Sequence, residues 1–458
     1  MPRLDKISLA FLLICSNAAA QTLEVTAPVM APRATSEREP VGTLMTLEHA
    51  YDIAAASDQS LRIAFIEVSK AELLPKSALT RVMPRLNGVM SYAKNSTTYS
   101  SAQGNHSGEG GAGLTLSQPL LDLSVFPARR KGLLAVEATR LARQFTIRET
   151  LYGVASAYFE VLKDERIVAV NKQSLALAQE QQNLAQKRAD VGEVTRSDVL
   201  RAQVSVETAR RVLITAENKL ELQRNTLRNI LNLAPDAPLR LAEPLPYKQD
   251  VPAFGPLLAI AYDHREDLRE SELVVQQAEQ DRLETRAQYA PTIVAEAGPK
   301  VRVSPHSVED RERSSRSTEW SADIAVKFPF FDGGQRDLDL VKKRLLIDQA
   351  VLEKELLSKK IEGQVKEAWL KVQTLEGSLT AVKAQVKAAE QGYADLQNQY
   401  SAGTAKSVDV LSALQDLSSA RLDLTSLTLD YEVALRGLEQ FSGTFQDLRV
   451  RQLMEKKR

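Results

Sequence analysis

The chain has 458 residues, which is too long for one ordinary compact core, so two or more structural units are expected. Its 59 basic and 59 acidic residues balance, and this neutral charge gives no reason to expect a nucleic-acid partner. The four histidines are scattered without zinc-ligand spacing, so no metal site is predicted, and the sequence contains no cofactor-binding motif.

Residues 1–20 have the composition of a secretory signal peptide. Basic residues precede an apolar run that is too short to span a bilayer, and small residues follow, so cleavage after Ala20 is expected. The alternative is a lipoprotein signal with Cys15 lipidated; Ile14 argues against it, because a small residue normally precedes that cysteine. Since Cys15 is the single cysteine, the secreted chain is expected to lack disulfides. Residues 21–43 are rich in Pro, Ala and Thr, which predicts a flexible leader.

The rest of the chain follows one plan twice. The segment VGEVTRSDVLRAQVSVETAR, which begins at Val191, returns 211 residues later as AGTAKSVDVLSALQDLSSAR. Other pairs keep the same order, among them MPRLNGV with APTIVAE and SQPLLD with KFPFFD. We therefore predict a tandem duplication, with repeat 1 over residues 44–233 and repeat 2 over 257–441. A proline-rich linker, 234–256, joins the repeats, and 442–458 form a tail.

Each repeat contains two alternating segments around a polar loop, which predicts one β-hairpin per repeat, at about 85–120 and about 291–329. The clearest strand is TEWSADIAVKF, in which apolar side chains from Trp320 onward alternate with mostly polar ones. The strands are expected to have roughly the 9–11 residues that cross a membrane as β structure. The connecting loops, 94–111 and 304–317, are rich in Ser, Gly, Asn and charge, and are expected to face the outside of the cell.

The longest segments of both repeats are predicted to be helical, over about 127–233 and about 334–441. Between Pro127 and Val191 there is no further proline, and apolar residues recur at helical spacing from Val154. A helix of about 60 residues is roughly 90–100 Å long, which is more than a compact domain can bury. Such helices must pack as coiled coils against neighbours of similar length.

A glycine stands in each repeat where one long helix is expected to end and a second to return. Gly192 and Gly403 would supply the left-handed residue of a helix C-cap. Asp198 and Asp409 follow in the first turn of the returning helix, where the helix macrodipole favours an acid. The expected N-caps are Thr195 or Ser197 in repeat 1 and Ser407 in repeat 2. By themselves, these features indicate ordinary helix-start acids.

The predicted strands of one chain are too few to form a closed barrel. Four strands do not close a barrel, and an open sheet cannot lie in lipid with unpaired edges. Three copies would supply about twelve strands, an even number that closes, with the long helices stacked below as a second barrel in water. The alternative is a secreted or periplasmic structural coiled-coil protein without channel activity, which accounts for the helices but not for the apolar strand faces.

The duplicated plan resembles the TolC-like outer-membrane efflux proteins over nearly all of the mature chain. The resemblance rests on the duplication, on the strand-exit segment PFFDGG at Pro329 and on two G-x-x-x-x-x-D-V-L turns; the segment PLLDLS at Pro119 lacks the glycine pair. It implies a homotrimer, mainly α with a β-barrel portion, in which a twelve-strand barrel in outer-membrane lipid continues into a periplasmic helical barrel. It also implies a passive exit duct for an inner-membrane pump or ABC transporter, joined through a periplasmic adaptor protein. No enzymatic activity and no cofactor is implied, and the substrate could be a drug, a metal or a protein.

The resemblance further implies a gate at the two helix turns. In that family the turns form periplasmic tips that close as an iris, so Asp409 would ring the pore. Asp198 would hold the tips shut by bonding to Tyr400 and to an arginine whose position is occupied here by Ala405. A second pore acid of the family is Ser412 here, so a single acidic ring and fewer latching bonds are expected.

Overall fold

The computed structural model describes residues 44–97, 105–243, 251–308 and 311–445. The chain divides into two units, Met1–Leu44 and Met45–Arg458, and the second contains all the elements described below. The expected signal peptide and leader, and most of the expected tail, lie outside the described residues.

The two repeats contain corresponding elements in the same order. Those of repeat 1 are α2 (Leu47–Ser57), α3 (Gln59–Ala71), α4 (Leu74–Leu79), the 3-10 turn η1 (Thr80–Val82), β1 (Arg85–Thr97), β2 (Asn105–Leu121), α5 (Val125–Asp190) and α6 (Arg196–Ile230). Those of repeat 2 are α7 (Phe254–His264), α8 (Glu266–Ala287), β3 (Thr292–Val308), β4 (Arg311–Lys327), α9 (Gln335–Ser401) and α10 (Ser407–Ser442). The predicted fold class, duplicated long helices with one β-hairpin per repeat, is confirmed.

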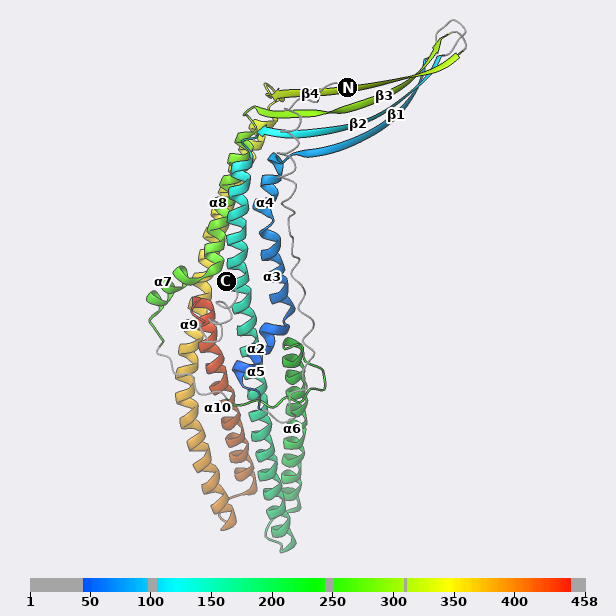
Figure 1. Ribbon diagram of the computed structural model, residues 1–458. Helices are drawn as coiled ribbons and strands as arrows, with labels where there is room; N and C mark the ends of the chain where they lie inside the picture. The colour runs from blue at the N-terminus through cyan, green and yellow to red at the C-terminus, as the bar shows by residue number, and fades with distance from the viewer. Residues whose placement is uncertain (1–43, 98–104, 244–250, 309–310, 446–458) are drawn as a thin grey trace. The chain divides into compact units, whose positions relative to one another are not determined.

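The four strands form one antiparallel sheet in the order β1-β2-β3-β4, so the hairpins of the two repeats lie side by side (Figure 1). β1 has 13 residues and each of the other strands has 17. The prediction of about 9–11 residues was therefore wrong. Its error lay in the polar segments assigned to loops, where Lys94 lies opposite Gly108 and Ser304 opposite Ser315. Such pairs form because ladder hydrogen bonds join backbone groups and need no apolar side chain.

Two very long helices organise the rest of the unit. α5 has 66 residues and α9 has 67, and each is therefore about 100 Å long. α5 packs against α6, α8 and α10 and against the short helices of repeat 1, while α9 packs against α7, α8 and α10 (Figure 1). Pro127 is the third residue of α5, where its missing N–H removes no helical hydrogen bond. Among the described residues, no helix is long and apolar enough to cross a membrane.

A buried apolar cluster surrounds the middle of α5. Tyr158 is completely buried there, and its hydroxyl lies 2.8 Å from the carbonyl oxygen of Met45 and 2.5 Å from that of Ala242. Met45 also forms an isolated parallel bridge with Leu241, so the beginning of repeat 1 and the linker after it meet over α5. In repeat 2, a second buried cluster joins α7, α9 and α10, with Leu257, Ala261, Ile361, Val365 and Leu435 among its members.

Candidate functional site at the helix turns and the sheet

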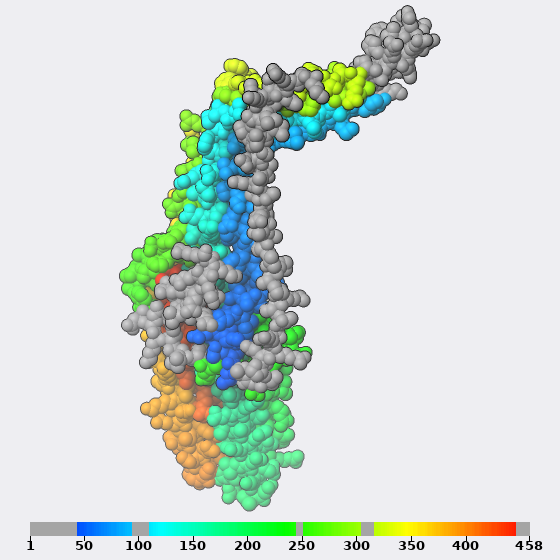
Figure 2. All heavy atoms as spheres, viewed as in Figure 1, coloured from blue at the N-terminus to red at the C-terminus, as the bar shows by residue number. Residues whose placement is uncertain are grey.

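The two helix turns have the same backbone construction. Gly192 and Gly403 have φ angles of +80° and +81°, which only glycine adopts without strain. In the first turn, the N–H of Glu193 donates to the carbonyl of Arg188 at 2.9 Å, and that of Gly192 donates to Ala189 at 3.0 Å. The N–H groups of Thr404 and Gly403 make the equivalent bonds in the second turn, at 2.9 and 3.0 Å. Both are Schellman C-caps, and both lie at the same end of the long helices (Figures 1 and 2).

The first returning helix begins with a complete capping box. The hydroxyl of Thr195 accepts from the N–H of Asp198 at 3.3 Å, and the Asp198 carboxylate accepts from the Thr195 N–H at 3.1 Å. The Thr195 hydroxyl also lies 2.7 Å from that carboxylate. These bonds lower the pKa of Asp198, with the hydroxyl as the main cause and the backbone N–H as the next. Of the two predicted N-caps, Thr195 is the one used.

The second returning helix has only half of this box. Its N-cap is Lys406, whose N–H donates to the Asp409 carboxylate at 3.4 Å. A lysine side chain has no acceptor for the helix N–H groups. The prediction of Ser407 as N-cap was wrong, because the repeat offset that aligns the glycines places Lys406 at the position of Thr195. Ser407 is instead the first helical residue and is buried.

Asp409 and Ser412 lie three residues apart on α10, so their side chains project from neighbouring positions of one helix face. Both side chains are exposed in the single chain. Asp409 is therefore available to face other copies or the solvent.

Arg188 connects the two turns within one chain. Its guanidinium lies 4.7 Å from the centroid of the Tyr400 ring, and its Nη1 donates to the Tyr400 carbonyl oxygen. Its Nε donates to Glu193 at 2.8 Å. Glu193 of the first turn therefore positions the Arg188 side chain for its contact with Tyr400 near the second turn. Arg188 is a residue that our sequence analysis missed. Its only signal was a basic residue in the last turn of α5, where the macrodipole favours a cation.

Tyr400 is only 3% exposed and packs in an apolar cluster formed by Ala178 of α5, Val206 of α6 and residues of α9 and α10. Its hydroxyl has no hydrogen-bond partner within the part of the chain that the structure describes. The carboxylate of Asp198 bonds to Thr195 instead. The structure therefore does not bring Asp198 and Tyr400 together in one chain. Tyr400 instead contacts Arg188 through its ring face and its carbonyl oxygen.

The sheet has an apolar and a polar face, because side chains alternate along each strand. The apolar face carries Leu86, Met90, Tyr92, Ala112, Leu114, Leu116, Ile293, Ala295, Ala297, Val301, Val303, Trp320, Ile324 and Val326. The polar face carries Arg85, Asn87, Ser91, Thr115, Ser117, Glu296, Lys300, Arg302, Glu319, Ser321, Asp323 and Lys327. The two faces suit two different surroundings, one apolar and one aqueous.

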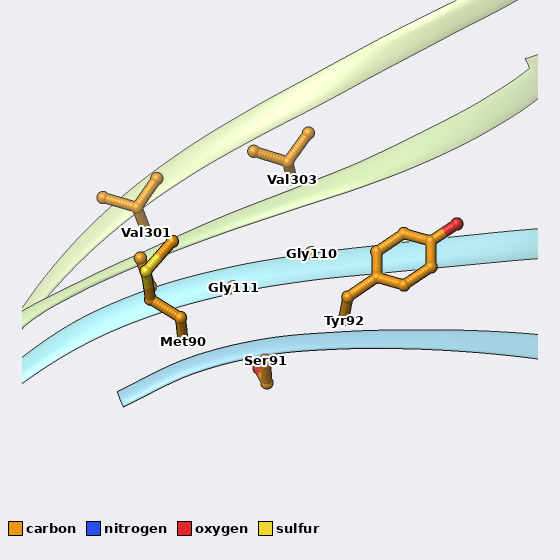
Figure 3. A pocket seen from close by; sticks show the side chains of 8 residues that line it. Met90, Ser91, Tyr92, Gly110, Gly111, Val301 and Val303 are labelled. Carbon is orange, nitrogen blue, oxygen red and sulfur yellow. The ribbon is translucent and has the colours of Figure 1, made fainter. Parts of the chain in front are cut away.

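Glycines of β2 leave a shallow hollow in the apolar face. Figure 3 shows Met90 and Tyr92 on one flank and Val301 and Val303 on the other, while the glycines between them add no side chain. Ser91 points to the opposite face of the sheet (Figure 3). The hollow is open and apolar, which fits contact with hydrocarbon. Among the described residues, no group of three or more His, Cys, Asp or Glu side chains could hold a metal ion.

The sequence matches the family described as outer membrane efflux protein in two blocks, residues 50–233 and 257–444. A relative named outer membrane efflux protein BepC, from Brucella suis, is 25% identical over 342 residues, which cover 73% of this chain and 72% of that protein. The outer membrane protein TolC of Escherichia coli is 22% identical over 403 residues, covering 86% of this chain and 79% of TolC.

Solved structures with the same fold include outer membrane channels. The Campylobacter jejuni CmeC outer membrane channel has a TM-score of 0.74 at 15% identity, with 89% of each chain covered. The open state of the Neisseria gonorrhoeae MtrE outer membrane channel has a TM-score of 0.70 at 21% identity, covering 87% of this chain and 89% of MtrE. At these identities, the likeness shows a shared fold.

Proposed function

The chain belongs to the outer membrane efflux protein family, and we propose that three copies of it form one gated exit duct. It is an outer-membrane efflux channel, as its family and its relatives indicate. In this proposal the protein is a homotrimer, and it receives substrate from an inner-membrane pump or ABC transporter through a periplasmic adaptor protein. No catalytic role is part of this proposal.

The observation that carries the trimer is the open four-stranded sheet with one apolar face. In lipid, every backbone N–H and C=O must be paired within protein, so the free edges of β1 and β4 require strands from other copies. Three copies supply about twelve strands, which is within the range of closed outer-membrane barrels. The apolar face would then contact lipid, and the polar face would line a water-filled passage.

The two helix turns are the best candidates for a gate in the periplasm. Three copies of Asp409 around the axis would form one acidic ring, with Ser412 beside it in place of a second acid. Asp198 stabilises the first turn through its bonds to Thr195. Arg188 and Tyr400 hold the two turns of each subunit together, so this contact would resist an opening in which one turn moves away from the other.

The experiment is to purify the protein from the outer-membrane fraction in mild detergent and measure its mass by multi-angle light scattering. We expect a trimer, because only oligomerisation closes the sheet. A monomer recovered from the soluble periplasmic fraction would contradict the proposal and favour a structural coiled-coil protein without channel activity.

A further inference from the structure

The hollow in the apolar face of the sheet lies beside a cation. One row of opposed residues crosses all four strands there, from Tyr92 through Gly110 and Val303 to Arg316. Among the strand residues whose side chains the structure describes, Arg316 is the one charged residue on this face. It is exposed, and no hydrogen bond or ion pair joins it to another described residue. A cation on a face that meets hydrocarbon needs an anion or water beside it.

This row lies at one boundary of the apolar face. Along β3 the face runs from Ile293 to Val303, ten residues further on, which is about 33 Å along the strand. A strand tilt of about 35–45° reduces this length to about 25 Å along the membrane normal, which is the height of the apolar band of an outer-membrane barrel. Phe330 and Phe331 follow β4 at the other boundary and are 88% and 86% exposed. In the proposed duct, the row would therefore lie at the level of the lipid headgroups.

The glycine of this row leaves room for a chain in the hollow. Met90 and Tyr92 stand on one flank and Val301 and Val303 on the other, around a volume of about 400 Å³ (Figure 3). A Cβ added at Gly110 would meet only the Tyr92 ring within 4 Å, at 4.0 Å, so the space above this glycine is open. Tyr92 is 76% exposed, and its hydroxyl points away from Met90 (Figure 3). The hollow is therefore apolar, with polar groups at its outer end.

We infer that the hollow binds an acyl chain of a lipid and that Arg316 binds the phosphate group of the same molecule. Tyr92 and Arg316 are three strand spacings apart, about 14 Å, so a headgroup above Val303 would lie between them. The planar fork of a guanidinium matches phosphate oxygens, and its charge-assisted hydrogen bonds are stronger than neutral ones. This inference rests on the proposed function, because that proposal places the apolar face in lipid.

The test counts the lipids that are bound to the detergent-purified trimer, by native mass spectrometry. The probe is dioleoyl phosphatidic acid; dioleoylglycerol lacks its phosphate group, and inorganic phosphate lacks its acyl chains. Arg316→Gln removes the cation, and Gly110→Leu fills the hollow. Arg302→Gln is the matched control that removes a cation from the polar face, and Gly88→Leu adds the same side chain to the apolar face outside the hollow.

We expect the parent to bind one phosphatidic acid per subunit, and both site variants to bind it at least about fivefold more weakly. The matched controls should bind it as the parent does, dioleoylglycerol should bind the parent more weakly, and inorganic phosphate should not bind. Parental binding by both site variants, or equal losses in the controls, would overturn the inference.

Two further outcomes separate this inference from its alternatives. Binding of inorganic phosphate that Arg316→Gln abolishes would overturn the lipid site in favour of one for free phosphate. An intact trimer that binds no phosphatidic acid would overturn this inference alone, whereas a monomeric mass for the parent would overturn it because the proposed function itself has failed.

Discussion

Arg188→Gln tests whether the two turns of a subunit are held together by the arginine. The guanidinium stacked on the Tyr400 ring contributes about 0.5–2 kcal/mol. Its bond to the carbonyl oxygen, made by a charged donor, contributes about 1.5–3 kcal/mol. Glu193 is 56% exposed, so that ion pair adds at most about 1 kcal/mol. With a net loss of about 2 kcal/mol per subunit, the population with separated turns should rise about 30-fold.

The measurement is single-channel conductance in planar bilayers, where Arg188→Gln should conduct more than the parent. Arg188→Lys should be intermediate, because a lysine keeps the charge but lacks the planar fork that reaches the ring and the carbonyl together. Tyr400→Phe is the matched control, since it removes only a hydroxyl without a partner among the described residues of the chain. It should conduct as the parent does. The family resemblance gives the opposite expectation, in which Tyr400→Phe and Asp198→Asn both loosen a latch.

Two results would refute this reasoning. One is parental conductance of Arg188→Gln in a variant whose trimer also melts at the parental temperature. The other is an increase for Tyr400→Phe as large as that for Arg188→Gln, which would mean that the hydroxyl holds the gate through another subunit.

Three further predictions concern the ring, the first turn and the sheet. Asp409→Asn should abolish block by multivalent cations and reduce cation selectivity in bilayer recordings, because three like charges near one axis attract counter-ions; unchanged block would leave the aspartate as a helix-start residue only. Thr195→Ala should weaken the first turn by about 1 kcal/mol, seen as roughly fivefold faster amide hydrogen exchange there, and exchange at the parental rate would contradict a role for the cap. Because the pKa of Asp198 lies below its ordinary 3.8, the carboxylate stabilises this turn at neutral pH and loses that effect as the pH falls through the lowered value, so the protection factor of these amides, corrected for intrinsic exchange, should fall in the parental protein only in acid. Gly298→Ala should reduce the yield of assembled trimer, because a Cβ there would overlap a backbone carbonyl of β2, whereas the control Gly153→Ala meets nothing within 4 Å and should assemble normally.

The repeated pattern was enough to predict the helices, the hairpins and the sheet faces. Hydrophobic periodicity and glycine placement are local signals, and they indicate where α5 ends at Gly192 and which strand residues share a face. Arg188 carried no such signal, because its partner Tyr400 lies 212 residues away along the chain. The cap of the second turn was missed for another reason, since Lys406 has no acceptor and a serine beside it has the better local propensity. Strand length was underestimated because backbone pairing continues through polar sequence.

Because α5 is long, a small tilt about its buried middle produces a large displacement at its end. Its middle is buried in the cluster around Tyr158, and its C-terminal part packs through Ala178 and Leu184 in a second cluster with α6, α9 and α10. The helix continues to Asp190, which is about 48 Å beyond Tyr158 at 1.5 Å per residue. A tilt of about 10° about that point therefore moves the turn sideways by about 8 Å without breaking one helical hydrogen bond. In the proposed duct, a small rotation at the middle of the helix would therefore widen the passage at the turns, so a bound partner could act on the subunit far from the pore itself.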